Sequence, residues 1–460
     1  MLPAELRRAI AEHEGGRVVL VLGAGCSKGA PTSLPLASEL AEETYGRLIA
    51  DEILVEGQCA NYRDLSALAD VIFERTGHQD VLVSRFNPQR FRNAEPNSGY
   101  KLAAALLRER AISSLMTLNF DLAISTALAN VGAVDVSTIN GPEDFGHLGL
   151  ANAIYLHRNA NAEPDRWILR SISLDAGWRE GWEGIIAHRV LVAPVVVFVG
   201  LGSPAAVLIE TTRRISRALQ AQINVYQVDT MPRAESAFFR ELGIPDDAYI
   251  QNSWEGFMEE LAARVVHAHQ SELEGRCERL IQEQGLTPEN CHDLCNRMLT
   301  LGLLGLGLLR SRWILDRATY LPLARIELDW IADLVLCVGL VERITESMAY
   351  FSQEGVVEFR KDDRIIAAVI VASGKGISSW LSLEAKLQGW APLFRGRNPS
   401  PRCALVAGVQ GARAEGVSPP QSIVAHGDAF DIIPRASNIS ILGVTELRQD
   451  PSLARRVTYL

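Results

Sequence analysis

The sequence is short of the features that mark secreted, membrane and zinc-cluster proteins. Its seven cysteines form no C-x-x-C pair, so the ligand spacing of the common structural zinc sites is missing. An odd number of cysteines without such pairs is typical of reduced thiols in the cytosol and not of a disulfide framework. The N-terminal residues mix acids with bases and lack the apolar core of a secretion signal. We therefore expect a cytoplasmic protein.

Long apolar runs and an excess of basic residues are also missing. The most apolar candidates, residues 299–309 and 365–372, are too short to cross a bilayer. The net charge is -10 and the pI is near 5.5, which argues against a surface devoted to nucleic-acid phosphates. We expect neither a membrane span nor direct sequence-specific binding of nucleic acid.

The chain is long enough for two or three domains. Of its 460 residues, 48% are hydrophobic and 22% are charged, which is typical of a globular protein with a large core. The pattern changes from helical, leucine-rich segments to strands near Val356. We expect a first domain at 1-270, a helical linker or oligomerisation segment at 271-350, and a C-terminal α/β regulatory or assembly domain at 351-460.

The stretch 17–35 joins a buried strand to a glycine turn. Residues 18–22 are apolar without alternation, which predicts a parallel strand buried on both faces. Gly23 and Gly25 follow directly. Glycine lets the backbone turn tightly and approach a phosphate, with free amides supplying a partial positive field. A tight strand-to-helix turn without any ligand would need the same residues.

Two common nucleotide-binding motifs do not fit this turn. The dehydrogenase fingerprint needs a third glycine that opens the helix at once, and here a loop delays the next helix. The Walker A loop needs a lysine after its last glycine, whereas Lys28 precedes Gly29. A different nucleotide-binding arrangement is required.

Polar side chains end two further apolar strands. Residues 112–117 run into Asn119 and Asp121, and residues 153–156 run into His157. Open α/β sheets bind their ligands at the carboxyl ends of such strands. Asp121 could instead cap the helix that follows it, and a histidine at the end of a strand could be a hydrogen-bonded structural residue.

A second glycine turn follows the apolar stretch Val190–Val199, which we expect to be a strand. Gly200, Gly202 and Ser203 form this turn, and a helix follows. The next expected strand, Ile223–Asp229, ends in an acid that could hold a ribose hydroxyl or cap a turn.

Four short motifs therefore follow one another along the chain: GAGCS at 23–27, TLNFD at 117–121, YLH at 155–157 and VGLGS at 199–203. In kind and order they resemble the motifs of the sirtuin-like NAD-binding domain, over about the first 270 residues. With the pattern of the second half, the expected fold class is α/β: a Rossmann-like parallel sheet with a helical insertion at about 61–109, followed by a helical segment and a C-terminal α/β domain.

The resemblance implies a role for each matching residue. The cofactor-binding residues that it implies are Gly23, Ala24, Gly25, Ser27, Gly200, Gly202, Ser203 and Asp229. Asn119 and Asp121 match the pair that holds the ribose and amide on the nicotinamide side, and His157 matches the catalytic base. Arg158 stands where the family usually has glycine, which puts the shape of any acyl-lysine channel in doubt.

The missing zinc module separates this chain from the protein-deacylating sirtuins. Cys291 and Cys295, with His292 and with His267 or His269, could be considered as a substitute set of zinc ligands. Helical spacing puts the two cysteines on one face but points His292 away from it, so we interpret the cysteines as buried thiols. We expect no zinc. Longer, zinc-free members of the family act in prokaryotic antiphage defence and hydrolyse NAD.

The resemblance thus implies an NAD glycohydrolase that releases nicotinamide and ADP-ribose. NAD is then a substrate, Asn119 orients the ribose and the attacking water, and His157 accepts a proton. Asp121 orients the substrate and favours the developing positive charge. The alternatives are an NAD-dependent protein deacylase and a non-catalytic sensor of NAD or ADP-ribose, although a sensor needs no base.

Partners follow from the resemblance and from the second half of the chain. Defence relatives are often encoded beside a HerA-type ATPase or an Argonaute-like protein, and the glycine-spaced leucines at 299–309 would permit close helix packing in a homo-oligomer. A nuclease site is not expected in the C-terminal domain. Lys375 has no acid two residues before it, and the acid and lysine of Glu384–Lys386 lie in a helical pattern.

Overall fold

The computed structural model describes residues 2–11, 17–202, 206–219, 222–284, 287–313, 328–373, 387, 394, 396–407 and 440–458. The chain divides into two compact units, Met1–Val265 and Val266–Leu460. The three-part division expected from the sequence stays a prediction. Among the helices that the structure describes, none is both long enough and apolar enough to span a membrane.

The first unit is built on a seven-stranded sheet in the order β3-β4-β2-β1-β5-β6-β7, in which every neighbouring pair is parallel. The strands are β1 (Val18–Leu22), β2 (Ser114–Thr117), β3 (Ser137–Ile139), β4 (Asn152–Tyr155), β5 (Val195–Val199), β6 (Asn224–Asp229) and β7 (Tyr249–Gln251). After β1, the chain forms β2, β3 and β4 on one side of it and then β5, β6 and β7 on the other. The strand order therefore reverses between β1 and β5, where sheets of this class bind their ligands.

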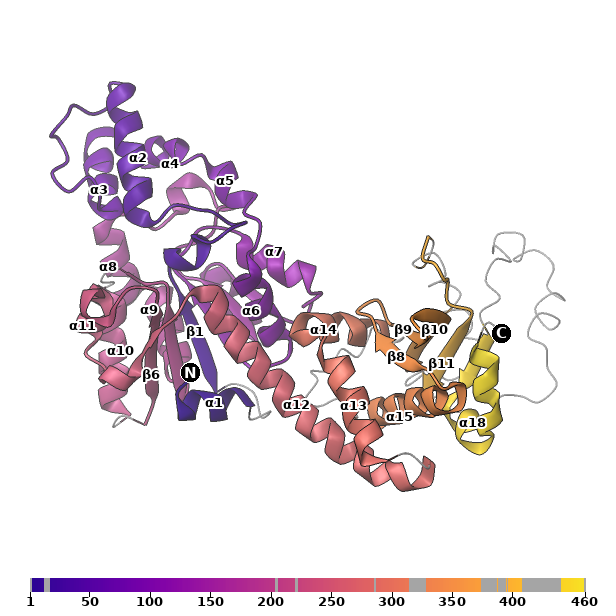
Figure 1. Ribbon diagram of the computed structural model, residues 1–460. Helices are drawn as coiled ribbons and strands as arrows, with labels where there is room; N and C mark the ends of the chain where they lie inside the picture. The colour runs from indigo at the N-terminus through magenta and orange to yellow at the C-terminus, as the bar shows by residue number, and fades with distance from the viewer. Residues whose placement is uncertain are drawn as a thin grey trace. The chain divides into compact units, whose positions relative to one another are not determined.

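Helices fill the connections between these strands. They are α1 (Ala4–Ala11), α2 (Ala37–Ala50), α3 (Leu65–Thr76), α4 (Asp80–Arg85), α5 (Pro88–Arg92), α6 (Ser98–Arg108), α7 (Ala123–Asn130), α8 (Ser171–Glu180), α9 (Trp182–Leu191), α10 (Ala206–Ala218), α11 (Ala237–Leu242) and α12 (Trp254–Gln284). Figure 1 shows α9 and α10 on one face of the sheet, α6 on the other, and α2 to α5 gathered beyond one end of the strands.

Burial on both faces explains the unbroken apolar sequence of the central strands. Val19 and Val21 of β1 belong to one apolar core with Ile186 of α9, and all five residues of β1 are buried. The residues that alternate with them face the helices on the opposite side. The predicted fold class, a Rossmann-like parallel sheet with a helical insertion, is confirmed.

The turns after β1 and β5 lie directly against each other. The amide of Gly25 donates to the carbonyl of Gly200 at 3.0 Å, and the amide of Gly23 donates to that of Val199 at 2.9 Å. A Cβ at Gly23 would lie 2.5 Å from the Gly200 carbonyl oxygen, and one at Gly25 would lie 2.8 Å from the Gly200 Cα. Gly200 itself has a φ of 67°. Close backbone packing alone therefore requires glycine here, and the expectation of free amides is wrong for Gly23 and Gly25.

The second unit contains a mixed sheet in the order β12-β11-β10-β9-β8, with antiparallel β8/β9 and β9/β10 pairs and parallel β10/β11 and β11/β12 pairs. Its strands are β8 (Met348–Phe351), β9 (Val356–Lys361), β10 (Arg364–Ser373), β11 (Cys403–Ala407) and β12 (Ser440–Gly443). The α-helices described in this unit, besides the end of α12, are α13 (Pro288–Leu299), α14 (Gly302–Trp313), α15 (Leu328–Thr345) and α18 (Val444–Gln449). The predicted C-terminal α/β pattern is thus confirmed as a second sheet.

Several predicted element boundaries are wrong for physical reasons. Val190 does not begin a strand but lies near the end of α9, and β5 starts only after Pro194, which has no amide to donate. Residues 348–350, expected to be helical, belong to β8, in which exposed and buried residues alternate. The strand β7 was not predicted. Lys375 and the segment Glu384–Lys386, considered above for a nuclease site, lie outside the described residues.

The contact between the two turns can be tested by adding one methyl group. We expect Gly25→Ala to lower the free energy of unfolding of the first unit by about 1–3 kcal/mol, because the methyl group meets the Gly200 backbone. The matched control is Gly46→Ala within α2, where an added Cβ meets nothing within 4 Å. This control should be neutral or stabilising by up to about 1 kcal/mol. Urea unfolding of both variants provides the measurement, and equal stabilities would contradict the packing role.

Candidate active site

A cavity of about 550 Å³ lies at the carboxyl ends of the central strands of the first unit. Its volume falls in the range of about 300–1,000 Å³ that is typical of small-molecule sites. The predicted site residues that line it are Gly23, Ala24, Ser27, Asn119, Asp121, His157, Gly200 and Gly202. Four loops that are far apart in sequence therefore meet at one place.

Two of the predicted residues that the structure describes, Gly25 and Asp229, do not line this cavity. Gly25 is held against Gly200 and is not among the lining residues. Asp229 ends β6, where its Oδ1 accepts from the amide of Met231 at 3.2 Å, so it caps a turn. Its Oδ2 is buried without a partner among the described residues. Ser203 lies outside the described residues.

The opposite wall of the cavity comes from the segment that separates β1 from β2. Residues 34–36 and the first turn of α2 line it, as do residues 63–66 at the start of α3. Asp64 fixes that start, because its side chain accepts from the amides of Ser66 and Ala67. The loop and helical insertion noted in the sequence therefore form one side of the site.

A buried polar network lies beneath the turn after β1. The Ser27 hydroxyl donates to Asp121 Oδ2 at 2.8 Å and lies 2.7 Å from the Tyr100 hydroxyl. The Asn119 side-chain amide donates to Ser27 Oγ at 3.2 Å, to the Gly23 carbonyl at 3.0 Å and to the Tyr100 hydroxyl at 3.3 Å. With Nδ2 fixed by these acceptors, Oδ1 of Asn119 makes no hydrogen bond to the described residues.

Asp121 satisfies both interpretations that the sequence left open. Its Oδ1 accepts from the amide of Ala123 at the start of α7, so it does bond the helix that follows. Its Oδ2 accepts from Ser27 inside the cavity wall. Burial raises the pKa of the Asp121 carboxyl, and the hydrogen bonds from Ser27 and Ala123 lower the pKa by less.

His157 is a neutral imidazole with one ring nitrogen unused. Burial lowers the pKa of His157 from 6.5 to about 4, and a hydrogen bond to the Leu118 backbone opposes that shift. Nε2 is buried and has no partner among the described residues, so the bond to Leu118 involves Nδ1. A ring that donates through Nδ1 carries its lone pair on Nε2. Phe120, which stacks on Trp167 at 4.7 Å, lies beside this ring.

Arg158 is held away from the ring that precedes it. It has a φ of 70°, a conformation that glycine adopts far more readily. Its guanidinium donates to the Asn140 carbonyl at 2.8 Å and to Glu143 Oε1 at 2.9 Å, and it lies over the Trp182 ring. The backbone at this position thus keeps a conformation that favours glycine, although the residue is arginine. The Arg158 guanidinium occupies the space beside Gly141.

Tyr100 is the site residue that the sequence analysis missed. It is 1% exposed, and its hydroxyl contacts both Ser27 and Asn119. Asn97 caps the helix that carries it and accepts from Trp254 Nε1 at 3.2 Å. Asn97 is recognisable as a helix start, but nothing local indicates that the third helical residue reaches a turn more than 70 positions away.

Comparison with solved structures finds Sir2 homologues. A Sir2 homologue bound to NAD matches with a TM-score of 0.31 and 17% identity, covering 59% of this chain and 95% of its own. Two mutant Sir2 homologues bound to ADP-ribose match with TM-scores of 0.33 and 0.34 at 17% and 19% identity, covering 58% and 59% of this chain and 98% of theirs. A likeness at this identity concerns the fold alone. No protein-family model and no curated protein matches the chain.

The neutral state of His157 predicts how stability depends on pH. Because the pKa of this group is lower in the folded state than in the unfolded state, the unfolded chain takes up its proton first as the pH falls. The contribution of neutral His157 to the free energy of unfolding is therefore full above pH 6.5 and disappears as the pH falls to about 4. A difference of this size corresponds to about 3 kcal/mol.

We expect His157→Asn to flatten the fall in unfolding free energy over this pH range, measured by urea titration at each pH. His267→Asn, at an exposed position of α12, is the matched control. A slope in His157→Asn as steep as that of the wild type would contradict the assignment.

Proposed function

We propose that the first unit is an NAD glycohydrolase that cleaves the bond between nicotinamide and ribose. The proposal rests on one observation: Asn119, Asp121 and His157 line one cavity together with residues of both glycine turns. The two acceptor atoms Asn119 Oδ1 and His157 Nε2 have no hydrogen-bond partner among the described residues. A ligand rich in hydroxyl groups, such as the ribose of NAD, would supply the donors that they lack.

NAD would lie across the place where the strand order reverses. Its phosphates would lie near Ala24 and Ser27, and its adenosine side near Gly200 and Gly202, in line with the sirtuin resemblance. Gly25 supports this arrangement indirectly through its contact with Gly200. The same proposal gives Ser203 and Asp229 a role in holding adenosine, since Asp229 Oδ2 has no hydrogen-bond partner among the described residues.

The bond to nicotinamide breaks easily because the leaving group is already cationic. The electron pair of the C1′–N bond passes to the nicotinamide ring, so no general acid is needed. Water then forms the new bond to C1′ and gives up one proton, and the products are nicotinamide and ADP-ribose. The protein must therefore orient a water molecule, accept its proton and favour positive charge at C1′.

In this proposal Asn119 orients the water molecule and His157 accepts its proton. The amide of Asn119 is immobilised by three hydrogen bonds, so Oδ1 offers a fixed acceptor to the water or to a ribose hydroxyl. His157 is neutral near pH 7 and carries its free electron pair on Nε2, so it can take the proton from water or from a ribose hydroxyl. Asp121, which accepts from Ser27 in the cavity wall, would favour the developing positive charge at C1′ when ionised.

The alternative of a protein deacylase requires space for an acylated lysine. Arg158 is paired with Glu143 and fixed to Asn140, directly after the histidine that would face such a substrate. We therefore favour water as the acceptor. A sensor without turnover would not need the unpaired base at His157.

The proposal extends to the biological setting through the resemblance alone. An NAD hydrolase that is always active would exhaust the cell's NAD, so we propose a cytoplasmic enzyme controlled within an antiphage defence complex. Its partners would be further copies of the chain and a HerA-type ATPase or Argonaute-like protein. The second unit would be the regulatory or assembly part of this complex.

NAD turnover tests the enzymatic proposal. The full chain, alone and with the product of the neighbouring gene, is incubated with NAD, and nicotinamide and ADP-ribose are quantified by chromatography. We expect Asn119→Ala and His157→Ala each to lower turnover at least about 100-fold, because each removes a group that acts on the water or ribose. The matched controls Asn130→Ala and His147→Ala, both at exposed positions, should keep wild-type turnover.

Two outcomes would overturn the proposal. One is nicotinamide release that survives both Asn119→Ala and His157→Ala. The other is the absence of any NAD-dependent rise in the thermal midpoint together with no release in either condition. Transfer of an acetyl group from a lysine peptide to ADP-ribose would favour the deacylase, and tight NAD binding without turnover would favour the sensor.

A further inference from the structure

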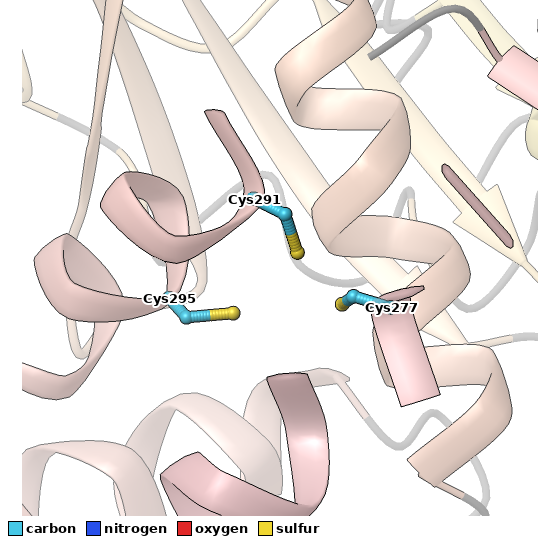
Figure 2. Close-up of side chains that lie close together, drawn as sticks. All are labelled: Cys277, Cys291 and Cys295. Atoms are coloured by element: carbon cyan, nitrogen blue, oxygen red, sulfur yellow. The ribbon is translucent and has the colours of Figure 1, made fainter. Parts of the chain in front are cut away.

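Three cysteines of the second unit converge in its apolar core. Cys277 lies on α12, while Cys291 and Cys295 lie one turn apart on α13. All three are at most 2% exposed, and their sulfur atoms lie within 4.8 Å of one another. Figure 2 shows the three Sγ atoms pointing into the same space between the two helices.

The spacing of these sulfur atoms is close to that of a metal–thiolate site. Zinc–sulfur bonds are about 2.3 Å long, so sulfur atoms around one zinc ion lie about 4 Å apart. A spacing of up to 4.8 Å requires only small side-chain movements to reach this value. A disulfide needs sulfur atoms about 2 Å apart and would leave the third cysteine out.

Ordinary core packing explains single buried cysteines but not this convergence. The cysteines belong to an apolar core that also includes Leu273, Leu294 and Met298. In such surroundings any side chain of suitable size would fill the space. Three sulfur atoms directed at one point, two of them from one face of a helix, provide a set of soft ligands for a thiophilic ion.

The charge of the site favours a divalent ion. Three thiolates leave a net charge of about -1 around a divalent ion and about -2 around a monovalent one, and burial penalises the larger charge. Water can supply the fourth ligand of a tetrahedral shell.

We propose that Cys277, Cys291 and Cys295 bind one zinc ion and so tie the C-terminal part of α12 to α13. The sequence analysis expected no zinc because no C-x-x-C pair is present. Folding instead brings Cys277 to two cysteines that lie 14 and 18 positions later in the chain. This site is separate from the NAD cavity and does not depend on the function proposed for it.

Metal analysis of the full chain tests the proposal. We expect about one zinc ion per chain in protein purified without chelator, measured by plasma mass spectrometry. Titration of the metal-free protein with Cd²⁺ should produce the ultraviolet thiolate-to-cadmium charge-transfer band of a three-sulfur site. Cys277→Ala and Cys295→Ala should each weaken Cd²⁺ binding by more than the 10–100-fold loss that an outer-shell change causes. Cys403→Ala, buried in the same core but outside the cluster, is the matched control.

Stability measurements keep the test decisive if a variant folds poorly. Zinc should raise the thermal midpoint of the wild type and of Cys403→Ala, but not of Cys277→Ala or Cys291→Ala. Three results would overturn the proposal: no cadmium charge-transfer band in the reduced wild type, undiminished binding in the cluster variants, or binding of Cu⁺ alone. A thiol count two below the seven of the sequence, in protein denatured without reductant, would indicate a disulfide and would also overturn it.

Discussion

The close contact between the turns after β1 and β5 determines the shape of the candidate active site. Gly25 and Gly200 are joined by a hydrogen bond of 3.0 Å, and neither turn has room for a Cβ at its contact. Because β1 and β5 are neighbours in the sheet, this contact closes the place where the strand order reverses. Ser27 from the first turn and Gly202 from the second both line the cavity. The glycines thus shape the site first, and any ligand contact depends on that shape.

The network beneath this floor explains which atoms remain available to a ligand. Ser27, Tyr100 and the backbone of Gly23 use both donor positions of the Asn119 amide, so only its oxygen remains. The Leu118 backbone uses one nitrogen of His157, so only the other remains. Both remaining atoms are acceptors. A site with two fixed acceptors beside a buried carboxylate suits water, hydroxyl groups and a carbon atom that becomes positive.

Much of the fold could be predicted because buried parallel strands leave an unbroken apolar sequence. β1 was predicted to the residue, whereas the start of β5 was not, since the end of α9 is equally apolar. At the site, strand-end polar residues such as Asn119 and His157 could be found because the sheet brings the carboxyl ends together. Tyr100 could not, because its place depends on how α6 packs and not on any local pattern. The alternatives for Asp229 needed the structure for the same reason.

The cysteine cluster lies beyond the reach of local sequence patterns for a related reason. The i, i+4 spacing of Cys291 and Cys295 shows a shared helical face, but it does not show what faces it. The answer depends on α12, which runs as one helix through the domain boundary expected after residue 270. Near its start, Trp254 of α12 donates to Asn97, which caps the helix that carries Tyr100. The C-terminal part of the same helix carries Cys277, whose sulfur atom lies within 4.8 Å of those of Cys291 and Cys295 on α13.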